Sequence, residues 1–343
     1  MTRARDTADT QDNLGGAVAP YVAGKNVLVN GAFDIWQRGT SFASGFASPY
    51  FIADRWQATR GGNVVGATMS RQTSGAPAGF QYYVRLQRDS GNTGTAAIFL
   101  AQCVETSMVF PYVNQTITLS FYARAGANYN ASANNLNVLF TTGTGTDQNN
   151  FSNSYTGAAD ALTSTASLTT SWQRFSYTLT LGSTVTEFMP RIGTQHSGTA
   201  GAADYVDITG VQVELGAAAT PFARAGGSIG GELDLCKRYY QRYPGAVGIA
   251  LNGVALSTTQ LLAQYILPEM RTSPSVASSG TIIISDQYLT DPQSTSTTVS
   301  VQGNGPMGGR VIIGTFTTLV VGRYYSAPGS AQGSGYLEFS AEL

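Results

Sequence analysis

Charged residues are scarce in this sequence. Asp, Glu, Lys and Arg make up 11% of the 343 residues, against roughly a quarter in typical soluble domains. The net charge is −1, and Lys25 and Lys237 are the only lysines. Binding to nucleic acid or to an anionic membrane draws on clusters of Lys and Arg. The composition therefore argues against both kinds of partner.

Residues that commonly carry catalysis or bind metals are also few. The one histidine, His196, lies in the polar run TQHSGTAG without a nearby acidic residue or cysteine, so we expect a solvated loop residue and neither a metal cluster nor a serine triad. Cys103 and Cys236 lack CxxC spacing, and we expect both to be buried as small apolar side chains. The sequence thus predicts no catalytic residue and no enzyme.

Long apolar runs are missing as well. No stretch of ~20 apolar residues could span a bilayer, and the opening MTRARDTADTQDNLGG lacks the apolar core of a secretory signal. We expect synthesis in the cytoplasm and no insertion into a membrane. Residues 1–24 are polar or rich in Gly and Ala, and they have no apolar period strong enough for an independent element. An extended arm that orders on a partner is the prediction for them.

Short apolar runs of period two fill the rest of the chain. From residue 26 to 215 they are bounded by Gly, Asn, Ser and Thr, which is typical of an all-β sandwich. In the first run, VLVN, we expect Val27 and Val29 on one face of a strand and Leu28 on the other. Trp36, Trp56 and Trp172 lie in or beside predicted strands, and burial is expected for each.

One segment predicts a helix. In GELDLCKRYYQRYPG, acidic residues come early, basic residues come late and Pro-Gly ends the pattern, as the helix dipole and helix stop signals require. Leu233, Cys236 and Tyr240, flanked by Tyr239, would form its apolar stripe and pack on the same chain rather than on copies of it. From about residue 247 the strand pattern returns, which indicates a second, smaller β-sandwich.

Aromatic residues are plentiful by comparison. The 18 Tyr, 15 Phe and 3 Trp stand among many hydroxyl and amide side chains. Rings that stack on sugars, with amides and acids that take the hydroxyl groups, suit a neutral glycan, and the same surface would suit a symmetric protein interface. Asp34 and Asp207 lie in strand-like segments at one end of the first sandwich, where an oxygen-rich corner could hold calcium.

Several motifs, taken in order, resemble bacteriophage proteins. The segments NVLVNGAFDIWQRG, SFYARA, TTSWQRFSYTLTL and YVDITGVQVELGAAATPFARA resemble a jelly-roll domain of phage tail fibres and minor tail proteins, which is similar to galactose-binding-like carbohydrate-binding modules. GELDLCKRYYQRY resembles the ELxxCxRYYxR helix that follows such jelly rolls, and LPEMRTSPSV resembles a strand and turn of their C-terminal sandwich. The resemblance covers roughly residues 25–290.

The resemblance implies an organisation and a role. Residues 1–24 would dock on the particle, 25–223 would form the jelly roll, 224–245 a linker with the helix, and 246–343 the C-terminal β-sandwich that meets the host. It implies a virion protein, usually a homotrimer, in contact with other virion proteins and with host glycan. It also places a structural calcium near Asp34 and Asp207, although the closing motif reads VDI where two acids are frequent. Carbohydrate contacts are predicted for loop residues of the C-terminal sandwich: Tyr288, Asp291, Tyr325 and Tyr336.

Two other functions fit the sequence. A capsid decoration or head-fibre protein needs the same arm and the same trimeric β modules, and would bind glycans weakly or not at all. A polysaccharide depolymerase needs two carboxylates facing each other across an aromatic-lined groove. We expect a tail protein that binds glycan without covalent chemistry, and the position of the arm on the particle would separate it from the capsid alternative.

Overall fold

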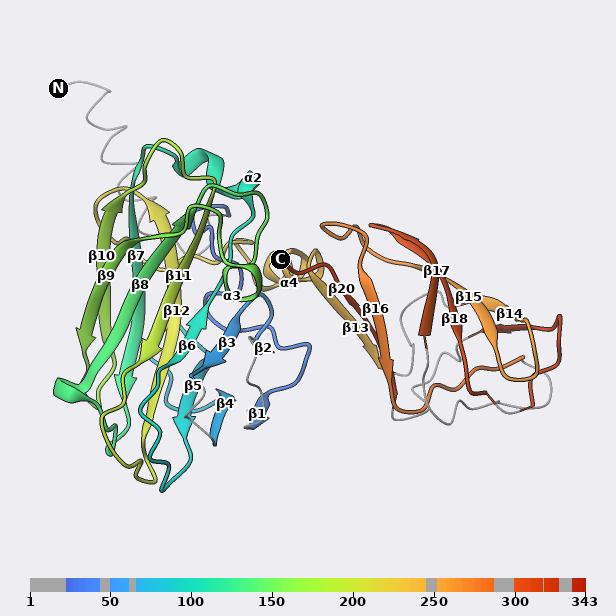
Figure 1. Cartoon of the computed structure of the whole chain (residues 1–343), viewed down its shortest axis with the longest axis horizontal. Coiled ribbons are helices and arrows are strands. Elements are labelled where there is room, and N and C mark those ends of the chain that lie inside the picture. The colour runs from blue at the N-terminus through green and yellow to red at the C-terminus, as the bar shows by residue number, and fades with distance from the viewer. Residues whose placement is uncertain are drawn as a thin grey trace, which may run out of the picture. The chain divides into compact units, whose positions relative to one another are not determined.

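The computed structural model describes residues 23–43, 50–61, 66–244, 252–286, 299–316, 318–326 and 335–343 (Figure 1). Strand accounts for 44% of these described residues and helix for 8%, which confirms the predicted all-β class. The chain forms two compact units, one of residues up to Leu235 together with Leu343, the other Cys236–Glu342. Almost all of the predicted arm, residues 1–22, lies outside the described residues.

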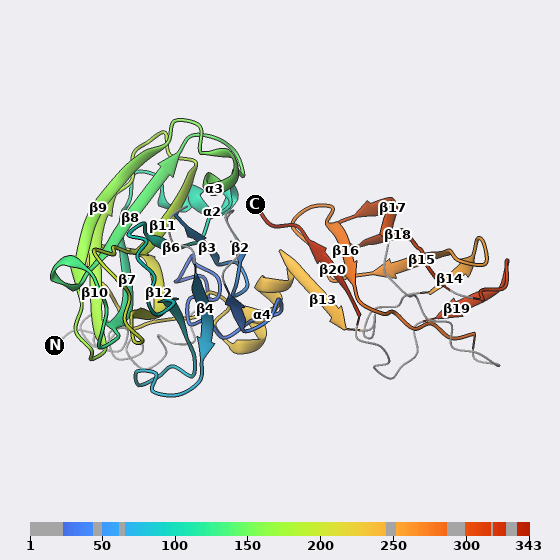
Figure 2. The same ribbon diagram turned by 60° about the horizontal axis from the view of Figure 1, so that its bottom comes forward.

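The first unit is a jelly-roll sandwich of two six-stranded antiparallel sheets. Sheet A has the order β1 (Ser41–Ala43), β4 (Ala67–Gln72), β5 (Tyr83–Arg88), β12 (Tyr205–Leu215), β7 (Thr116–Ala125) and β10 (Gln173–Thr180). Sheet B has the order β2 (Tyr50–Phe51), β3 (Gln57–Arg60), β6 (Ile98–Ala101), β11 (Glu187–Thr194), β8 (Asn135–Gly143) and β9 (Ala159–Ser167), which lie side by side in Figure 2. The short helices of this unit are α2 (Thr106–Val109), η2 (Phe110–Tyr112), η3 (Ser132–Asn134) and α3 (Asn150–Asn153).

Period-two sequence explains these strands. In β10, Phe175, Tyr177 and Leu179 pack against the core while the residues between them face outward. Large rings from both sheets fill the space between the sheets, since Phe121 of β7 and Phe140 of β8 are fully buried. Burial of each such side chain stabilises the fold by about 1.5–3 kcal/mol.

The three tryptophans differ in their burial. Trp56 is fully buried and Trp36 nearly so, as predicted. Trp172 is only half-buried, and its indole Nε1 donates a hydrogen bond to the carbonyl oxygen of Gly75 at 2.8 Å. Its ring lies on the outer side of sheet A, where β10 is an edge strand.

The predicted first strand, VLVN, is wrong. Residues 26–36 form turns and irregular backbone, and Asn30 and Phe33 have positive φ angles of 61° and 55°. The N–H of Leu28 donates to Asn26 Oδ1, and the N–H of Val29 donates to Gln102 Oε1. Side-chain amides thus take the backbone hydrogen bonds that a neighbouring strand would otherwise accept. The side chains of Leu28 and Val29 are both buried.

The predicted helix is present but short. α4 (Ile229–Lys237) starts after Ser228, whose Oγ accepts from the N–H of Gly231, and it carries Glu232 in its first turn and Lys237 in its last. Tyr240, expected in the helical stripe, instead begins β13 (Tyr240–Pro244), which pairs with β20 (Tyr336–Ser340). The β-favouring sequence YYQRY and its partner strand override the helical pattern.

α4 is tied to the jelly roll of the same chain by hydrogen bonds. Glu232 is 1% exposed, and its carboxylate accepts hydrogen bonds from the backbone N–H groups of Asn30 and Gly226. Burial raises the pKa of Glu232 above its ordinary value. The carboxylate therefore joins the helix to the turn that opens the sandwich. Cys236 is fully buried, as predicted, and Leu233 is half-buried.

The second unit starts earlier than the sequence suggested, at Cys236 rather than 246, and so includes β13. It has two antiparallel sheets around one core that contains Tyr265, Val311 and Phe339. Sheet C has the order β13, β20 (Tyr336–Ser340) and β16 (Ser275–Ser279). Sheet D has the order β17 (Val299–Gly305), β18 (Gly308–Ile313), β15 (Leu261–Ile266), β14 (Asn252–Ala255) and β19 (Tyr324–Ser326). In the described parts of both units, no helix has the length and hydropathy to cross a membrane.

Candidate ligand groove

The four loop residues predicted to contact carbohydrate lie in different environments. Tyr288 and Asp291 lie outside the described residues. Tyr325 does not offer a stacking face, because it is 1% exposed in the core and its hydroxyl accepts from the N–H of Val320 at 3.1 Å. Tyr336 is half-buried, and the guanidinium of Arg242 lies over its ring with Cζ 3.5 Å from the ring centroid.

Both aspartates that were predicted to bind calcium form ion pairs with arginine. Asp207 is fully buried between Arg85 and Arg124, whose Nε atoms lie 2.7 and 2.9 Å from its carboxylate oxygens. Asp34 lies 2.8 Å from Nε of Arg224. Among the described residues, no group of three His, Cys, Asp or Glu side chains is arranged to hold a metal ion. Calcium here stays a prediction, and binding would have to displace these guanidinium groups.

The chain itself covers part of the outer face of sheet A. Arg85 lies over the ring of Tyr205 and Arg124 over the ring of Trp172, at 3.5 and 4.8 Å from Cζ to centroid. Further along β12, Glu214 accepts hydrogen bonds from Thr220, which lies in the segment that follows the strand. These positions of the face are therefore occupied by residues of the chain.

His196 was expected in solvent but is buried, with 6% exposed. Its Nε2 lies 2.7 Å from Thr194 Oγ1, whereas Nδ1 is 3.9 Å from Asp204, beyond hydrogen-bond distance. Burial, with a smaller contribution from the charge of Arg88, lowers the pKa of His196 to about 3. The ring is therefore uncharged at neutral pH and packs beside Tyr129.

A buried ion pair explains why this loop folds inward. Arg88 and Asp204 are both fully buried, with Nη2 of Arg88 2.5 Å from Oδ2 of Asp204. Arg88 also donates to the carbonyl oxygens of Gly94 and Gly198, and Asp204 accepts from the N–H of Asn130 at 3.1 Å. Three loops of one end of the sandwich are thereby held together.

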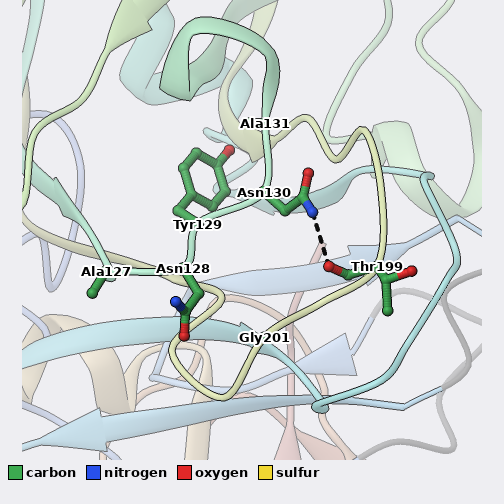
Figure 3. Close-up of a pocket in the computed structure, with 7 residues that line it drawn as sticks. All are labelled: Ala127, Asn128, Tyr129, Asn130, Ala131, Thr199 and Gly201. Carbon is green, nitrogen blue, oxygen red and sulfur yellow. Dashed lines mark hydrogen bonds between the residues drawn. The ribbon is translucent and has the colours of Figure 1, made fainter.

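Two of these loops line an open polar pocket of about 450 Å³ (Figure 3). Asn130 Nδ2 donates to the carbonyl oxygen of Thr199 at 2.8 Å, and Asn128 Oδ1 accepts from the N–H of Ala203. The ring of Tyr129 is only 6% exposed, so the pocket presents no aromatic face. It is lined by Ala127, Asn128, Tyr129, Asn130, Ala131, Thr199 and Gly201.

A second hollow lies on the outer face of sheet B, and strand register shows how it is built. Phe99 of β6 is paired with Gly193 of β11, Gly193 with Asn137 of β8, and Asn137 with Thr165 of β9. Directly paired residues share a face of the sheet. These positions form one row of the outer face. The neighbouring positions in β6, β11 and β8, which are Leu100, Ile192 and Val138, belong to the core.

The next row of the outer face continues the hollow. Ala101, Arg191, Leu139 and Thr163 are paired across the same four strands. Between β6 and β9 the sheet spans about 14 Å, from three strand spacings. The hollow has a volume of about 420 Å³ and is lined by six residues, which we call the groove: Phe99, Asn137, Leu139, Thr163, Ser164 and Thr165.

The position of the Phe99 ring depends on a glycine. A Cβ atom at Gly193 would lie 2.2 Å from Cδ1 and 2.4 Å from Cε1 of Phe99. The ring therefore occupies the space above the β11 backbone that any other residue would fill. Phe99 is half-buried there, so part of the ring remains open to the groove.

Beside Phe99 lies an ion pair. Cζ of Arg191 is 5.7 Å from the ring centroid of Phe99, and Nη2 is 2.8 Å from Asp160 Oδ1. Asp160, on β9, also accepts from Thr141 Oγ1 at 2.6 Å. The two charges at the border of the groove thus neutralise each other.

Part of the remaining outer face of sheet B is covered. Ala101, Cys103, Tyr155 and Met189 form a small apolar cluster, against which Phe151 and Leu343 pack. Both cysteines are buried, as predicted, and burial raises the pKa of the Cys103 thiol. The segment between β8 and β9 thus bounds the groove, and the open part is the portion that contains Phe99 and Asn137.

Sequence reasoning missed the groove. Phe99 stands within the apolar run AAIFLAQ, where core packing is the ordinary explanation. Its alternation with Ile98 and Leu100 places it on the opposite face, but only the pairing with Gly193 shows that the ring has room to lie on the sheet. No pattern in one sequence predicts that register.

Comparison with known proteins gives limited information. No protein-family model matches the sequence, and no curated protein matches it. Among solved structures, the chain is similar to a CBM4 structure at 20% identity and a TM-score of 0.34, covering 55% of this chain and 98% of that chain. It is similar to TmCBM61 in complex with beta-1,4-galactotriose at 13% identity and a TM-score of 0.34, covering 56% and 99%.

A phage protein is also among the similar structures. The enzymatically active domain of tailspike protein 4 from bacteriophage CBA120 is 11% identical with a TM-score of 0.33, covering 56% of this chain and 21% of that chain. All of these TM-scores lie below 0.5. The function proposed below therefore rests on the residues of this chain.

Proposed function

We propose that the chain is a glycan-binding protein and that the groove on sheet B is its binding site. The observation that carries this proposal is the half-open Phe99 ring above Gly193, beside the amide of Asn137 and the hydroxyl groups of Thr163 and Thr165. A ring stacks on the apolar face of a sugar, while amide and hydroxyl groups take its hydroxyls. No residue of the groove carries a charge, which suits a neutral sugar.

Binding is proposed without hydrolysis. Glycoside hydrolysis needs two carboxyl groups on either side of the scissile bond. The six groove residues include no carboxylate, and the nearby Asp160 is held by Arg191. A depolymerase therefore remains the weaker alternative, and an assay for new reducing ends on polysaccharide incubated with the protein would reveal it.

Binding assays with the full chain test the site. We expect Phe99→Ala and Asn137→Ala to lose at least fivefold in affinity for neutral oligosaccharides found on a glycan array, measured by titration calorimetry. Asn128→Ala, in the pocket without an exposed ring, is the matched control and should bind as the wild type does. Equal loss in Asn128→Ala, or no loss in Phe99→Ala, would contradict the proposal.

We further propose that this glycan binding serves a bacteriophage particle, as a tail fibre or minor tail protein that attaches to the host surface. The supporting observation is the order of sequence motifs from NVLVNGAFD to LPEMRTSPSV. The proposed assembly is a homotrimer held on other virion proteins by residues 1–24. A shallow groove binds weakly, and linked copies can raise avidity about 10²–10⁴-fold.

The oligomeric state of the chain and its location on the particle are tested separately. Light scattering on the purified chain should give three times the 36.0 kDa chain mass. A map of the intact particle should place the chain on the tail. Density on the capsid lattice would instead favour the capsid decoration or head-fibre alternative, for which weak glycan binding is sufficient.

A further inference from the structure

The groove has an ion pair at its border and no charge in its lining. Arg191 lies on β11 in register with Leu139 of the groove, and its guanidinium approaches the ring of Phe99. Its side chain is 18% exposed, so the cation lies in a partly desolvated position where an anion would be bound strongly. By itself, Arg191 would attract a sugar carboxylate into the groove.

Asp160 opposes that attraction. Its Oδ1 lies 2.8 Å from Nη2 of Arg191, and the hydroxyl of Thr141 fixes the same oxygen. Asp160 is 39% exposed and lies three residues before Thr163 of the groove. A polysaccharide with carboxylates would meet this negative charge and would also have to compete with it for the guanidinium. A neutral polysaccharide meets neither cost.

The donor of Arg191 that Asp160 engages is Nη2. Nε of Arg191 is buried and has no hydrogen-bond partner among the described residues, so it is not open to a ligand. Removal of the Asp160 charge would leave a cation whose Nη2 no longer faces a carboxylate, next to a sugar-binding surface. Such a cation is suited to a carboxylate, since Arg presents several N–H donors in one plane.

We infer that Asp160 is a specificity-determining residue, which makes the groove selective for uncharged polysaccharides by neutralising Arg191. This inference rests on the proposed glycan binding at the groove. It predicts that the carboxylate of Asp160 determines whether the groove prefers neutral or acidic glycans.

Two matched pairs of oligosaccharides test the inference. Mannohexaose and cellohexaose, both β-1,4-linked, are compared with the β-1,4-linked mannuronate and glucuronate hexamers, which differ from them by a carboxylate in place of each C6 hydroxymethyl group. Calorimetry is done on the full chain at low salt and at 0.5 M NaCl. The variants are Asp160→Asn, which keeps an oxygen acceptor for Thr141 and Arg191, and Asp160→Asn with Arg191→Gln.

The expected result is a reversal of preference. Wild-type protein should bind a neutral hexamer at least tenfold more tightly than its acidic counterpart. Asp160→Asn should gain about tenfold for the acidic hexamer, as for a hydrogen bond to a charged group, and leave neutral binding within about twofold. The gain should be lost at 0.5 M NaCl and in the double variant.

The outcomes separate the inference from the function on which it rests. If wild-type protein binds a neutral hexamer and Asp160→Asn gains nothing for the acidic one, the charge selection is overturned and groove binding stands. If the wild type and Asp160→Asn bind none of the four hexamers, both are overturned. Acidic binding by the wild type equal to neutral binding would also overturn the selection. Melting temperatures of the variants within a few degrees of the wild type show that the fold is kept.

Discussion

Alanine at position 193 is the sharpest probe of the groove. The added Cβ would lie 2.2 Å from Cδ1 of Phe99, so the ring must move by about 1.5 Å to reach an ordinary contact distance. Gly193 is not in the left-handed region, so β11 accepts alanine without backbone strain. The substitution therefore acts on Phe99 rather than on the strand.

The magnitude follows from two opposing effects. Overpacking of this kind costs about 1–3 kcal/mol, and replacement of glycine in a strand returns about 0.5–1 kcal/mol. We expect Gly193→Ala to lower the free energy of unfolding by about 1 kcal/mol in urea denaturation. Glycan affinity should fall at least fivefold, as in Phe99→Ala, because the displaced ring no longer lies on the sheet.

A double-mutant cycle refutes or supports this reasoning. In Phe99→Ala, the space above position 193 is empty, so adding Gly193→Ala should raise stability by about 0.5–1 kcal/mol and cost no further affinity. The coupling free energy between the two sites should then equal the overpacking cost, about 1.5–2 kcal/mol. If Gly193→Ala weakens binding equally with and without the Phe99 ring, the ring is not what the glycine positions.

Three further predictions concern the fold. Asp204→Asn leaves Arg88 buried without its partner charge and should lower the free energy of unfolding by about 3–5 kcal/mol, measured by denaturant titration. His196 has a folded pKa of about 3, below its ordinary 6.5, so the unfolded chain binds a proton that the folded chain excludes and stability falls as pH drops from about 6.5 towards 3. The slope approaches 1.4 kcal/mol per pH unit, and stability of the wild type relative to His196→Gln should fall by about 2–3 kcal/mol between pH 7 and 4.5; an unchanged difference would contradict burial of a neutral ring. Glu232→Ala leaves the N–H groups of Asn30 and Gly226 unpaired and should lower the free energy of unfolding by about 2–4 kcal/mol, whereas Glu232→Gln, which keeps one acceptor, should cost less in the same denaturant titration.

Local patterns in the sequence predicted much of the architecture. Alternating residues such as those of β10 predicted strands, and the charge order around Glu232 and Lys237 predicted a helix. The burial of Cys103 and Cys236 followed from spacing that suits neither metal nor redox chemistry. Each of these predictions depends on neighbours within about ten residues, where one face must meet the core.

The predictions failed where contacts with other segments of the chain determine the local structure. Leu28 and Val29 look like part of a strand, but the side-chain oxygens of Asn26 and Gln102 accept the hydrogen bonds of their backbone N–H groups. Tyr240 continues a helical pattern, but β20 pairs with it. Tyr325 resembles a loop aromatic, yet it is in the core of the C-terminal unit.

The sequence by itself determined that this chain is a weakly charged, all-β protein with two sandwiches and one helix near their junction, because hydrophobic period and helix signals are local properties. Only the tertiary structure decided which aromatic ring is available to a ligand and which charges meet. Phe99 is open because register places Gly193 beside it, and the charge of Arg191 is balanced because β8, β9 and β11 bring Thr141 and Asp160 close to it. Those contacts join residues tens of positions apart, so their energy depends on the pairing of whole strands and not on any one segment.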